Sequence, residues 1–388
     1  MRVLANLVLV CALSTGCKSD AAPPEDAGQE SSVDAPLSGD DARVMDIDEA
    51  DSVADDALAA DAGVLDIDTL RSRYGLLETV AGTGLVDRVN GWSESFEGEP
   101  GTAAELSRPH MAMADAAGNI YIADKEAHGV RRLDASGVIT TVAGTNVAGF
   151  DGDAPRAATA AALDNPNGLW VRDDGTFYIL DLGNDRVRAV DIDGQIRTLF
   201  EIGGAGAGRG LWVADDETLA YVAAGTRLLR WTPDGGVEVL ASGFSSLANL
   251  HVAPDGTLGV TDRGAHLVYA LADDGTRTVI AGNGTTDGGG DGMPALETGL
   301  DEVRGIWFHP EGGALLATHD GSQIWYLDVA GYVHLMVDGD KGEHSGDGEP
   351  YDSPGEKISE ARAVTMDGAG NILITERDEG HVRRVNIR

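Results

Sequence analysis

The sequence predicts an all-β protein, a six-bladed β-propeller closed by a strand from the N-terminal side. A unit of about 40 residues, in which short apolar runs alternate with turns rich in Gly and Asp, recurs six times. The sixth copy ends at Arg388, one strand short. Residues 76–82 (LLETVAG) resemble residues 139–144 (ITTVAG), the fourth strand of the first copy. We therefore expect residues 76–82 to complete the last blade and remove an open sheet edge.

The first copy, residues 108–144, shows why each unit is a blade. Its apolar run 111–114 leads into Asp115–Gly118, in which Asp accepts backbone hydrogen bonds and Gly supplies positive φ. Residues 119–123 (NIYIA) are β-branched and aromatic and predict a second strand. Two further strands, at 130–133 and 138–142, follow after polar turns. Four short antiparallel strands, here a to d, cannot bury both faces alone and need neighbouring copies.

The copies differ in length at one place, between strand d and the next strand a. The turn between strands a and b falls at positions 39 to 58 residues apart, namely Gly118, Gly175, Glu217, Gly256, Gly312 and Gly370. Four d–a loops are long, at residues 82–107, 144–164, 282–301 and 339–360. Because d–a and b–c connections emerge on one face, we expect these loops to gather there as a binding surface.

The repeat resembles the NHL-repeat family of six-bladed β-propellers. The resembling residues are 118–124 (GNIYIAD) with His128 and Arg131, and Asp181 with Arg188. The bacterial branch also carries a GDG-P-A loop before strand a, which is found here at residues 290–295, at 346–350 and, shortened, at 152–155. The resemblance covers residues 76–388 and implies a six-bladed propeller of bacterial lipoprotein type.

The composition limits the classes of partner. The chain has 28 Lys and Arg against 65 Asp and Glu, a net charge of −37. Nucleic-acid binding rests on basic contacts to phosphates, so this balance argues against it. The charge suits an exported protein, and we expect a monomer.

Residues 1–17 predict a bacterial lipoprotein signal peptide. Arg2 is followed by an apolar run, 3–13, that is too short to span a bilayer. The segment 13–17 (LSTGC) resembles a lipobox, although Ser14 stands where Leu is preferred, so ordinary signal cleavage remains the alternative. Cys17 would then be the lipidated residue. The only other Cys lies inside the signal peptide, so the mature chain has no disulfide. We expect anchoring at the bacterial cell envelope, in the outer membrane.

Residues 18–73 predict a disordered acidic linker, and residues 74–388 predict the propeller. The linker holds sixteen acidic and four basic residues and no Phe, Trp or Tyr. Such a composition cannot bury enough apolar surface to fold, and its like charges extend it.

Two sets of residues are candidates for structural roles or ligands. A large side chain recurs within strand a, and we expect this set to fill a core ring rather than to stack a cofactor: Met113, Trp170, Trp212, His251, Trp307 and Thr365. Acidic side chains recur in the long loops, at Glu99, Asp153, Asp291 and Asp347. Oxygen-rich loops can bind calcium, but Asp beside Gly commonly caps backbone N–H groups, and we favour capping.

A third set marks the start of strand a and therefore the mouth of the central channel. It consists of His110, Asn167, Arg209, Asn249, Arg304 and Arg362. Three Arg and a His around one axis would bind an anion. In this acidic ring these side chains could instead form ion pairs with loop carboxylates, and we favour ion pairing over anion binding.

The sequence therefore predicts a binding scaffold whose long-loop face takes a protein or glycan of the envelope. The alternative is a metal-dependent, calcium-type hydrolase or lyase at the channel mouth, since six-bladed relatives in other families hydrolyse lactones or cleave C–N or C–O bonds. No HExxH, CxxC or GxSxG spacing is present, and we assign no catalytic residue.

Overall fold

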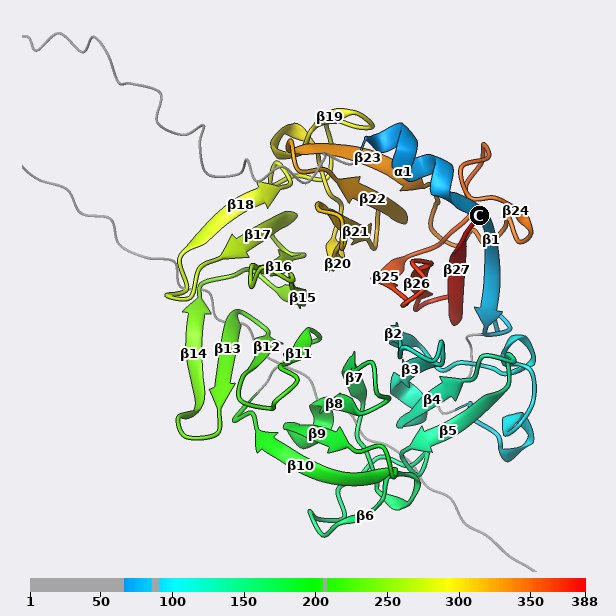
Figure 1. Ribbon diagram of the computed structural model, residues 1–388, viewed down its shortest axis with the longest axis vertical. Helices are drawn as coiled ribbons and strands as arrows, with labels where there is room; N and C mark the ends of the chain where they lie inside the picture. Colours follow the sequence, from blue (N-terminus) through cyan, green and yellow to red (C-terminus); the bar gives the residue numbers. More distant parts are fainter. Residues whose placement is uncertain (1–65, 86–90, 205–207) are drawn as a thin grey trace, which may run out of the picture. The chain divides into compact units, whose positions relative to one another are not determined.

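The computed structural model describes residues 66–85, 91–204 and 208–388, which form a closed ring of six antiparallel sheets (Figure 1). Each sheet is one blade, with its first strand at the axis and its last strand at the perimeter. The innermost strands of all neighbouring blades contact one another, including those of the last and first blades. The prediction of an all-β propeller with six blades is confirmed. No helix among the described residues is long and apolar enough to cross a membrane.

The first three blades follow the chain in order. Blade one contains β2 (Pro109–Ala114), β3 (Ile120–Asp124), β4 (Gly129–Leu133) and β5 (Ile139–Ala143). Blade two contains β7 (Pro166–Val171), β8 (Phe177–Asp181), β9 (Arg186–Val190) and β10 (Gln195–Glu201). Blade three contains β11 (Leu211–Val213), β12 (Ala220–Ala224), β13 (Arg227–Thr232) and β14 (Gly236–Ser242). The second strand of each is buried throughout because neighbouring blades cover both its faces.

The last three blades complete the ring. Blade four contains β15 (Leu247–Val252), β16 (Leu258–Asp262), β17 (Leu267–Leu271) and β18 (Arg277–Ala281). Blade five contains β20 (Val303–Phe308), β21 (Ala314–Thr318), β22 (Gln323–Leu327) and β23 (Tyr332–Val337). Blade six contains β25 (Ala361–Met366), β26 (Ile372–Glu376), β27 (His381–Ile387) and, as its outer strand, β1 (Tyr74–Ala81). The pairing of β1 with β27 confirms the predicted closure.

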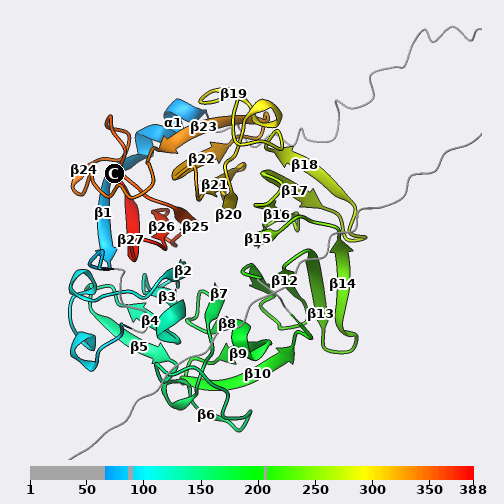
Figure 2. The same ribbon diagram turned by 180° about the vertical axis from the view of Figure 1, so that it is seen from behind.

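The ring has two faces, which Figures 1 and 2 show in turn. The turn face carries the tight turns after the first and third strands of each blade, such as residues 115–118 and 134–137. The loop face carries the connections after the second strand and the starts of the innermost strands. Short 3-10 turns lie in the connections, at η1 (Glu94–Phe96), η2 (Gly101–Ala103), η3 (Lys125–Ala127), η4 (Ala158–Ala160), η5 (Leu182–Asn184) and η6 (Ala295–Glu297).

The middle of each long loop runs outward to the edge of its blade rather than over the axis, and only loop ends such as Lys341 and Glu360 reach the channel mouth, which corrects the expectation of a surface built from whole loops. Three of them contain a short strand that pairs with the outermost strand of the following blade: β6 (Arg156–Ala157) with β10, β19 (Met293–Pro294) with β23, and β24 (Glu349–Pro350) with β1. In the fourth loop Pro100 bridges Val138, beside β5. The loops follow this path because the outer edge of a sheet presents unpaired backbone groups.

The end of the predicted linker is folded. Residues 67–73 form helix α1 (Ile67–Arg73), which Asp66 caps by accepting a hydrogen bond from the Thr69 N–H. Leu70 is fully buried beside Tyr74, and Arg71 is ion-paired with Asp291 at 2.8 Å. One buried leucine and this ion pair hold α1 against the ring, so the linker boundary at residue 73 needs correction. The predicted signal peptide, Cys17 and residues 18–65 of the linker lie outside the described residues.

A buried ion pair recurs where the second strand of a blade ends. Asp124 lies 3.1 Å from Arg131 and Asp181 lies 3.4 Å from Arg188, with all four side chains almost completely buried. Glu376 and Arg383 form the same pair at 3.2 Å in blade six. The carboxylate also accepts a backbone N–H from the incoming d–a loop, as Asp181 does from Asp164. The pair therefore holds the second strand, the third strand and the preceding d–a loop together. Its residues are among those that carry the family resemblance.

Candidate functional site

A hollow of about 570 Å³ opens at the channel mouth on the loop face. We call its lining the arginine mouth: Arg209, Arg263, Arg304, His319, Lys341, Glu360, Arg362, Arg377 and Asp378. Six of these nine residues are cations and two are carboxylates. The arginine mouth is therefore a local concentration of positive charge in a chain whose net charge is −37.

The structure brings together half of the residues predicted for this mouth. Arg209, Arg304 and Arg362 line the hollow; Arg304 and Arg362 lie at the second position of β20 and β25, and Arg209 lies two residues before β11. Asn167 and Asn249 do not line it, and both are buried. The side-chain amide of Asn167 donates to the Gly208 carbonyl at 2.6 Å, and the Asn249 side-chain oxygen accepts from the Leu250 N–H at 2.8 Å. Both asparagine side chains therefore form hydrogen bonds with the protein backbone and do not face a ligand in the hollow.

The sixth predicted residue, His110, is buried and faces the cationic cluster. Neither of its ring nitrogens has a hydrogen-bond partner in the described part of the chain. Burial, reinforced by the charges of Arg362 and Arg209, holds the pKa of His110 well below its usual range. His110 is therefore neutral at neutral pH and contributes no positive charge to the mouth.

Both alternatives for the arginines, pairing and anion binding, find support in the contacts. Arg304 is ion-paired with Glu302, and Arg362 lies 3.7 Å from Asp378. These carboxylates belong to the start of β20 and to the connection after β26, not to the acidic positions of the long loops. Arg209 has no ion-pair partner among the described residues, and the pairing of the mouth is therefore incomplete.

Several buried donors of the arginine mouth have no acceptor. In the described residues these are Nε and Nη1 of Arg209, Nη1 of Arg304, Nε of Arg362 and Nε of Arg377. Arg304 and Arg362 are each only 5% exposed. A buried donor without a partner costs about 1–3 kcal/mol, more if it is charged, so folded proteins seldom leave one unmatched. Five such donors at one hollow are a feature of anion-binding sites.

The pKa values of two arginines in the mouth are lowered, which is consistent with an anion-binding site. Burial, together with the neighbouring charges of Arg304 and Arg263, lowers the pKa of Arg209 to about 9. Burial and the charges of Arg209 and Arg304 lower the pKa of Arg362 to about 7. A bound anion would supply the missing negative charge and relieve the repulsion among these guanidinium groups.

His319 is the histidine that lines the arginine mouth. Its Nδ1 lies 2.8 Å from Asp320, and its Nε2 lies 3.1 Å from Asp378 and 2.8 Å from Nη2 of Arg362. Burial is the largest cause of its lowered pKa, so the ring is neutral at neutral pH. A neutral ring that donates from Nδ1 to Asp320 accepts the Arg362 N–H at Nε2.

Ligand atoms that could hold a cation also occur here. His319 groups with Glu302 and Asp320, and again with Glu360 and Asp378. Arg304 already bonds Glu302, and Arg362 already bonds His319. A metal ion would have to displace these guanidinium groups, and the geometry therefore suits an anion better than a metal.

A second repeat position, the residue directly after the second strand of a blade, supplies much of the mouth. Arg263, His319 and Arg377 are each the first residue after the second strand of a blade, following β16, β21 and β26. Comparing that one position across the copies would have revealed them. Lys341 and Glu360 come from a long loop with no regular pattern, and no sequence signal marked them.

The acidic side chains of the long loops lie away from the mouth and bind the outer strands. Asp347 accepts the Thr79 N–H at 2.7 Å, and Asp291 accepts the Leu335 N–H at 2.8 Å. Asp153 accepts a hydrogen bond from the Thr198 hydroxyl. Each carboxylate thus clamps its loop to the outermost strand of a different blade, and these contacts favour capping over calcium binding.

In blade one the equivalent place is taken by Glu97 rather than by Glu99. One side-chain oxygen of Glu97 accepts the Thr141 N–H at 2.9 Å, and the other accepts the Thr141 hydroxyl. Glu99 instead uses its backbone carbonyl to accept the Ile139 N–H. In blade one the carboxylate that bonds the outermost strand therefore lies two residues before the predicted position, Glu99.

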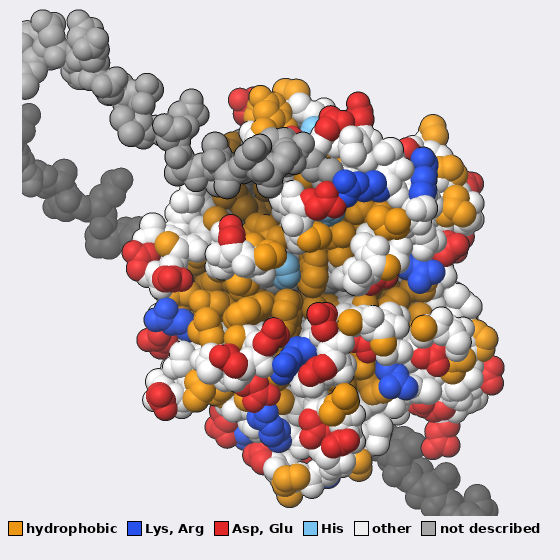
Figure 3. All heavy atoms as spheres, viewed as in Figure 1, with side chains coloured by type: hydrophobic (Ala, Val, Ile, Leu, Met, Phe, Trp, Pro, Cys, Tyr) orange, Lys and Arg blue, Asp and Glu red, His pale blue; other side chains and the backbone are white. Residues whose placement is uncertain are grey.

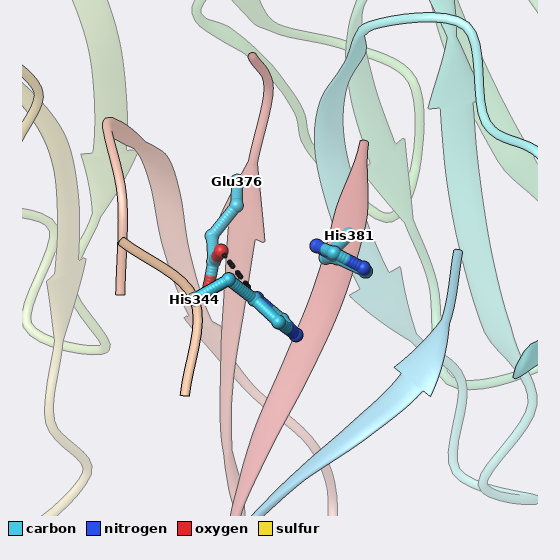
Figure 4. Close-up of side chains that lie close together, drawn as sticks. All are labelled: His344, Glu376 and His381. Atoms are coloured by element: carbon cyan, nitrogen blue, oxygen red, sulfur yellow. Dashed lines mark hydrogen bonds and ion pairs between the residues drawn. The ribbon is translucent and has the colours of Figure 1, made fainter. Parts of the chain in front are cut away.

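A second histidine group lies in blade six, where His344, Glu376 and His381 meet (Figure 4). The two imidazole rings stack with centroids 3.7 Å apart and planes 17° apart. Ring lone pairs lie in the ring plane, so parallel rings cannot both direct one at a single ion. Nη1 of the buried Arg383 also lies within 3.2 Å of both His344 and Glu376. We therefore assign this group to packing.

The large side chains of strand a converge at the axis on the turn face. Met113, His251 and Thr365 are buried, as expected of a core ring. Trp170, Trp212 and Trp307 are only half-buried and line a second hollow, of about 840 Å³. Figure 3 shows hydrophobic side chains and a histidine at the centre of this face. The core prediction therefore holds for part of the set, and the rest forms an open surface.

Comparisons of sequence identify few relatives. No family model matches the chain. The Arabidopsis thaliana protein SUPPRESSOR OF QUENCHING 1, chloroplastic, is 32% identical over 112 residues. That match covers 27% of this chain and only 10% of the plant protein. The NHL-type resemblance therefore stays a prediction.

Solved structures share the fold at low identity. A protein of unknown function from Bacteroides thetaiotaomicron aligns with a TM-score of 0.63 and 16% identity, over 80% of this chain and 76% of its own. An auxiliary nutrient binding protein from the same organism gives 0.58 and 13% over the same shares. A gluconolactonase from Xanthomonas campestris gives 0.51 and 16%, over 82% and 92%. The fold thus serves both binding proteins and enzymes and does not choose between them.

Proposed function

We propose that this protein is an exported binding protein that holds the anionic group of an envelope ligand in the arginine mouth. The observation that carries the proposal is the set of five buried N–H donors in the arginine mouth that have no acceptor among the described residues. Guanidinium groups bind carboxylate and phosphate through paired hydrogen bonds, so the ligand class is an acidic glycan or an acidic segment of a protein. A nutrient-binding protein with the same fold is consistent with such a role.

Arg209 offers the sharpest test because it has no carboxylate partner to leave behind among the described residues. We expect inorganic phosphate, titrated calorimetrically into the full-length protein, to bind about tenfold more weakly after Arg209→Gln, because a charge-assisted hydrogen bond contributes about 1.5–3 kcal/mol. Without phosphate, the melting temperature should stay the same or rise, since removing one like charge relieves repulsion. Arg197→Gln, which removes an exposed arginine on β10, is the matched control.

Two results would contradict this function. Equal phosphate affinity in wild type and Arg209→Gln would place the anion elsewhere. A large fall in melting temperature with unchanged affinity would give Arg209 a structural role only.

The proposal places the binding site at the outer membrane through acylation of Cys17, and the acidic residues 18–65 would then act as a spacer. Cells that express wild type or Cys17→Ser can be labelled with a radioactive fatty acid and partitioned in detergent. Label and detergent partitioning should both be lost in Cys17→Ser. Retention of the label would rule out the lipid anchor at this residue.

A second candidate, an enzyme at the same mouth, rests on His319. This histidine contacts Asp320 and Asp378 in a hollow lined with arginines, an arrangement that can stabilise the oxyanion of ester or lactone hydrolysis beside a base. The gluconolactonase neighbour makes glucono-lactone a reasonable probe. Hydrolysis by the wild type that is lost in His319→Asn, with phosphate binding intact, would favour the enzyme over the binding protein.

A further inference from the structure

The second hollow, on the turn face, has the opposite chemistry to the arginine mouth. Its base consists of Trp170, Trp212, Trp307 and His251, which we call the aromatic floor. Three carboxylates line it, those of Asp173, Asp215 and Asp367, and no Lys or Arg does. We propose that this hollow binds an organic ammonium cation on the aromatic floor, at a site distinct from the anion site.

Within the aromatic floor the Trp170 ring is tilted relative to its three neighbours, whereas His251 stacks on Trp307. The Trp170 ring lies 6.1 Å from Trp212 at 55°, 6.1 Å from Trp307 at 33° and 5.7 Å from His251 at 47°, measured between centroids and planes. Because these rings are not coplanar, they present differently oriented aromatic surfaces at the base of the hollow. Aromatic faces attract a methylated ammonium group electrostatically.

The histidine in the floor is neutral, so it does not oppose a cation. Its Nδ1 accepts the Phe308 N–H at 3.0 Å, and the proton is therefore on Nε2. Burial also lowers the pKa of His251 to about 3. The His251 ring stacks on Trp307 with centroids 4.0 Å apart, which fixes both rings.

The charges at the rim favour a cation. Asp173 is exposed and has no ion-pair partner among the described residues. Asp215 lies 3.7 Å from the neighbouring Arg172, which also approaches Asp174 at 3.9 Å, so these charges are partly balanced. The Asp367 carboxylate accepts hydrogen bonds from the Ala369 and Asn371 N–H groups of its own turn. The hollow is thus negative at its rim and neutral at its floor.

Packing of the core does not by itself account for this surface. Met113 and Thr365 occupy the same place in strand a and are buried, although Met113 reaches the edge of the hollow. The three tryptophans are only partly buried, and none of their indole N–H groups donates a hydrogen bond within the described residues. Exposed aromatic surface in a hollow is a common mark of a ligand site.

The test titrates the full-length protein with choline and with its neutral isostere, 3,3-dimethyl-1-butanol, by calorimetry and tryptophan fluorescence. We expect choline to bind saturably and to change the fluorescence, and the isostere to bind at least tenfold more weakly, because only choline gains the cation–π attraction. Asp173→Asn should weaken choline binding about fivefold, whereas Asp193→Asn, an exposed carboxylate in the turn before β10, should leave it unchanged. Trp212→Leu should abolish it.

Three outcomes would overturn the proposal: no saturable choline binding, equal affinity for the neutral isostere, or equal effects of Asp173→Asn and Asp193→Asn. The Asp173 variant keeps the test decisive if Trp212→Leu fails to fold, because Asp173 is exposed. Arg209→Gln should bind choline as the wild type does, which separates this site from the arginine mouth.

Discussion

Leu77 in β1 lies directly opposite Val385 in β27, so the two ends of the folded ring are joined within one sheet. Both side chains are fully buried in one hydrophobic cluster with Leu70 and Tyr351. The Leu77 carbonyl also accepts the Gly348 N–H of the loop that covers β1. Closure of the ring therefore depends on side-chain burial as well as on backbone pairing.

Truncation of Leu77 tests the closure. We expect Leu77→Ala to lower the free energy of unfolding by about 2–5 kcal/mol, since it leaves a cavity in a buried cluster. Urea unfolding followed by circular dichroism measures the change. The control is Leu76→Ala on the same strand, because Leu76 is 42% exposed and should cost little. Equal losses for the two variants would contradict a special role for Leu77.

The buried pair Asp124–Arg131 predicts a large effect of a small change. Asp124→Asn should destabilise the protein by about 3–5 kcal/mol, because it leaves the fully buried Arg131 without its counter-charge. Thermal or urea unfolding provides the measurement. Replacing both residues, as Asp124→Leu with Arg131→Met, should recover most of the loss. A double variant as unstable as Asp124→Asn would indicate that the pair itself stabilises the blade.

Gly168 predicts a link between strand packing and the anion site. A Cβ on this residue would lie 2.3 Å from the Arg209 carbonyl oxygen, so Gly168→Ala must push β7 away from the segment that carries Arg209. We expect lower stability and weaker phosphate binding in the same variant. Gly149→Ala, whose Cβ would meet Ala162 at an ordinary 3.5 Å, should change neither. Normal phosphate affinity in Gly168→Ala would show that the mouth tolerates the displacement.

His381 predicts a sensitivity to acid. Burial, together with the nearby His344 and Arg383, lowers the pKa of His381 to about 3, against about 6.5 in the unfolded chain. Between about pH 6.5 and pH 3, His381 is protonated in the unfolded state but stays neutral in the folded state. The free energy of unfolding therefore falls as the pH is lowered through this range. At pH 5 this one group accounts for about 2 kcal/mol.

The variant His381→Phe isolates that contribution. Nδ1 of His381 has no hydrogen-bond partner in the described residues, so the substitution loses no bond at that atom and keeps a ring against His344. Between pH 7 and pH 5, urea unfolding should show the variant losing about 2 kcal/mol less than the wild type. Parallel losses would mean that other groups dominate the acid response.

The period and chemistry of the repeat were enough to predict the blades. Alternation of apolar strands with turns such as Asp115–Gly118 indicates four strands, and the unpaired sixth copy requires residues 76–82. The starts of the innermost strands can be aligned between copies, so the sequence predicts Arg209, Arg304 and Arg362 at one mouth, and all three line the hollow. Strand and turn patterns are local properties of the chain, and they recur at matching positions in each copy.

Tertiary structure decided where the long loops run and which residues become neighbours. The sequence shows their length, but the unpaired edges of β5, β10, β23 and β1 draw them outward, where Asp153, Asp291 and Asp347 bond the outer strands. The contact of Arg362 with His319, the unmatched donors of Arg209 and the grouping of the tryptophans depend on distances around the ring. Such distances are set by how blades pack, which no single repeat contains.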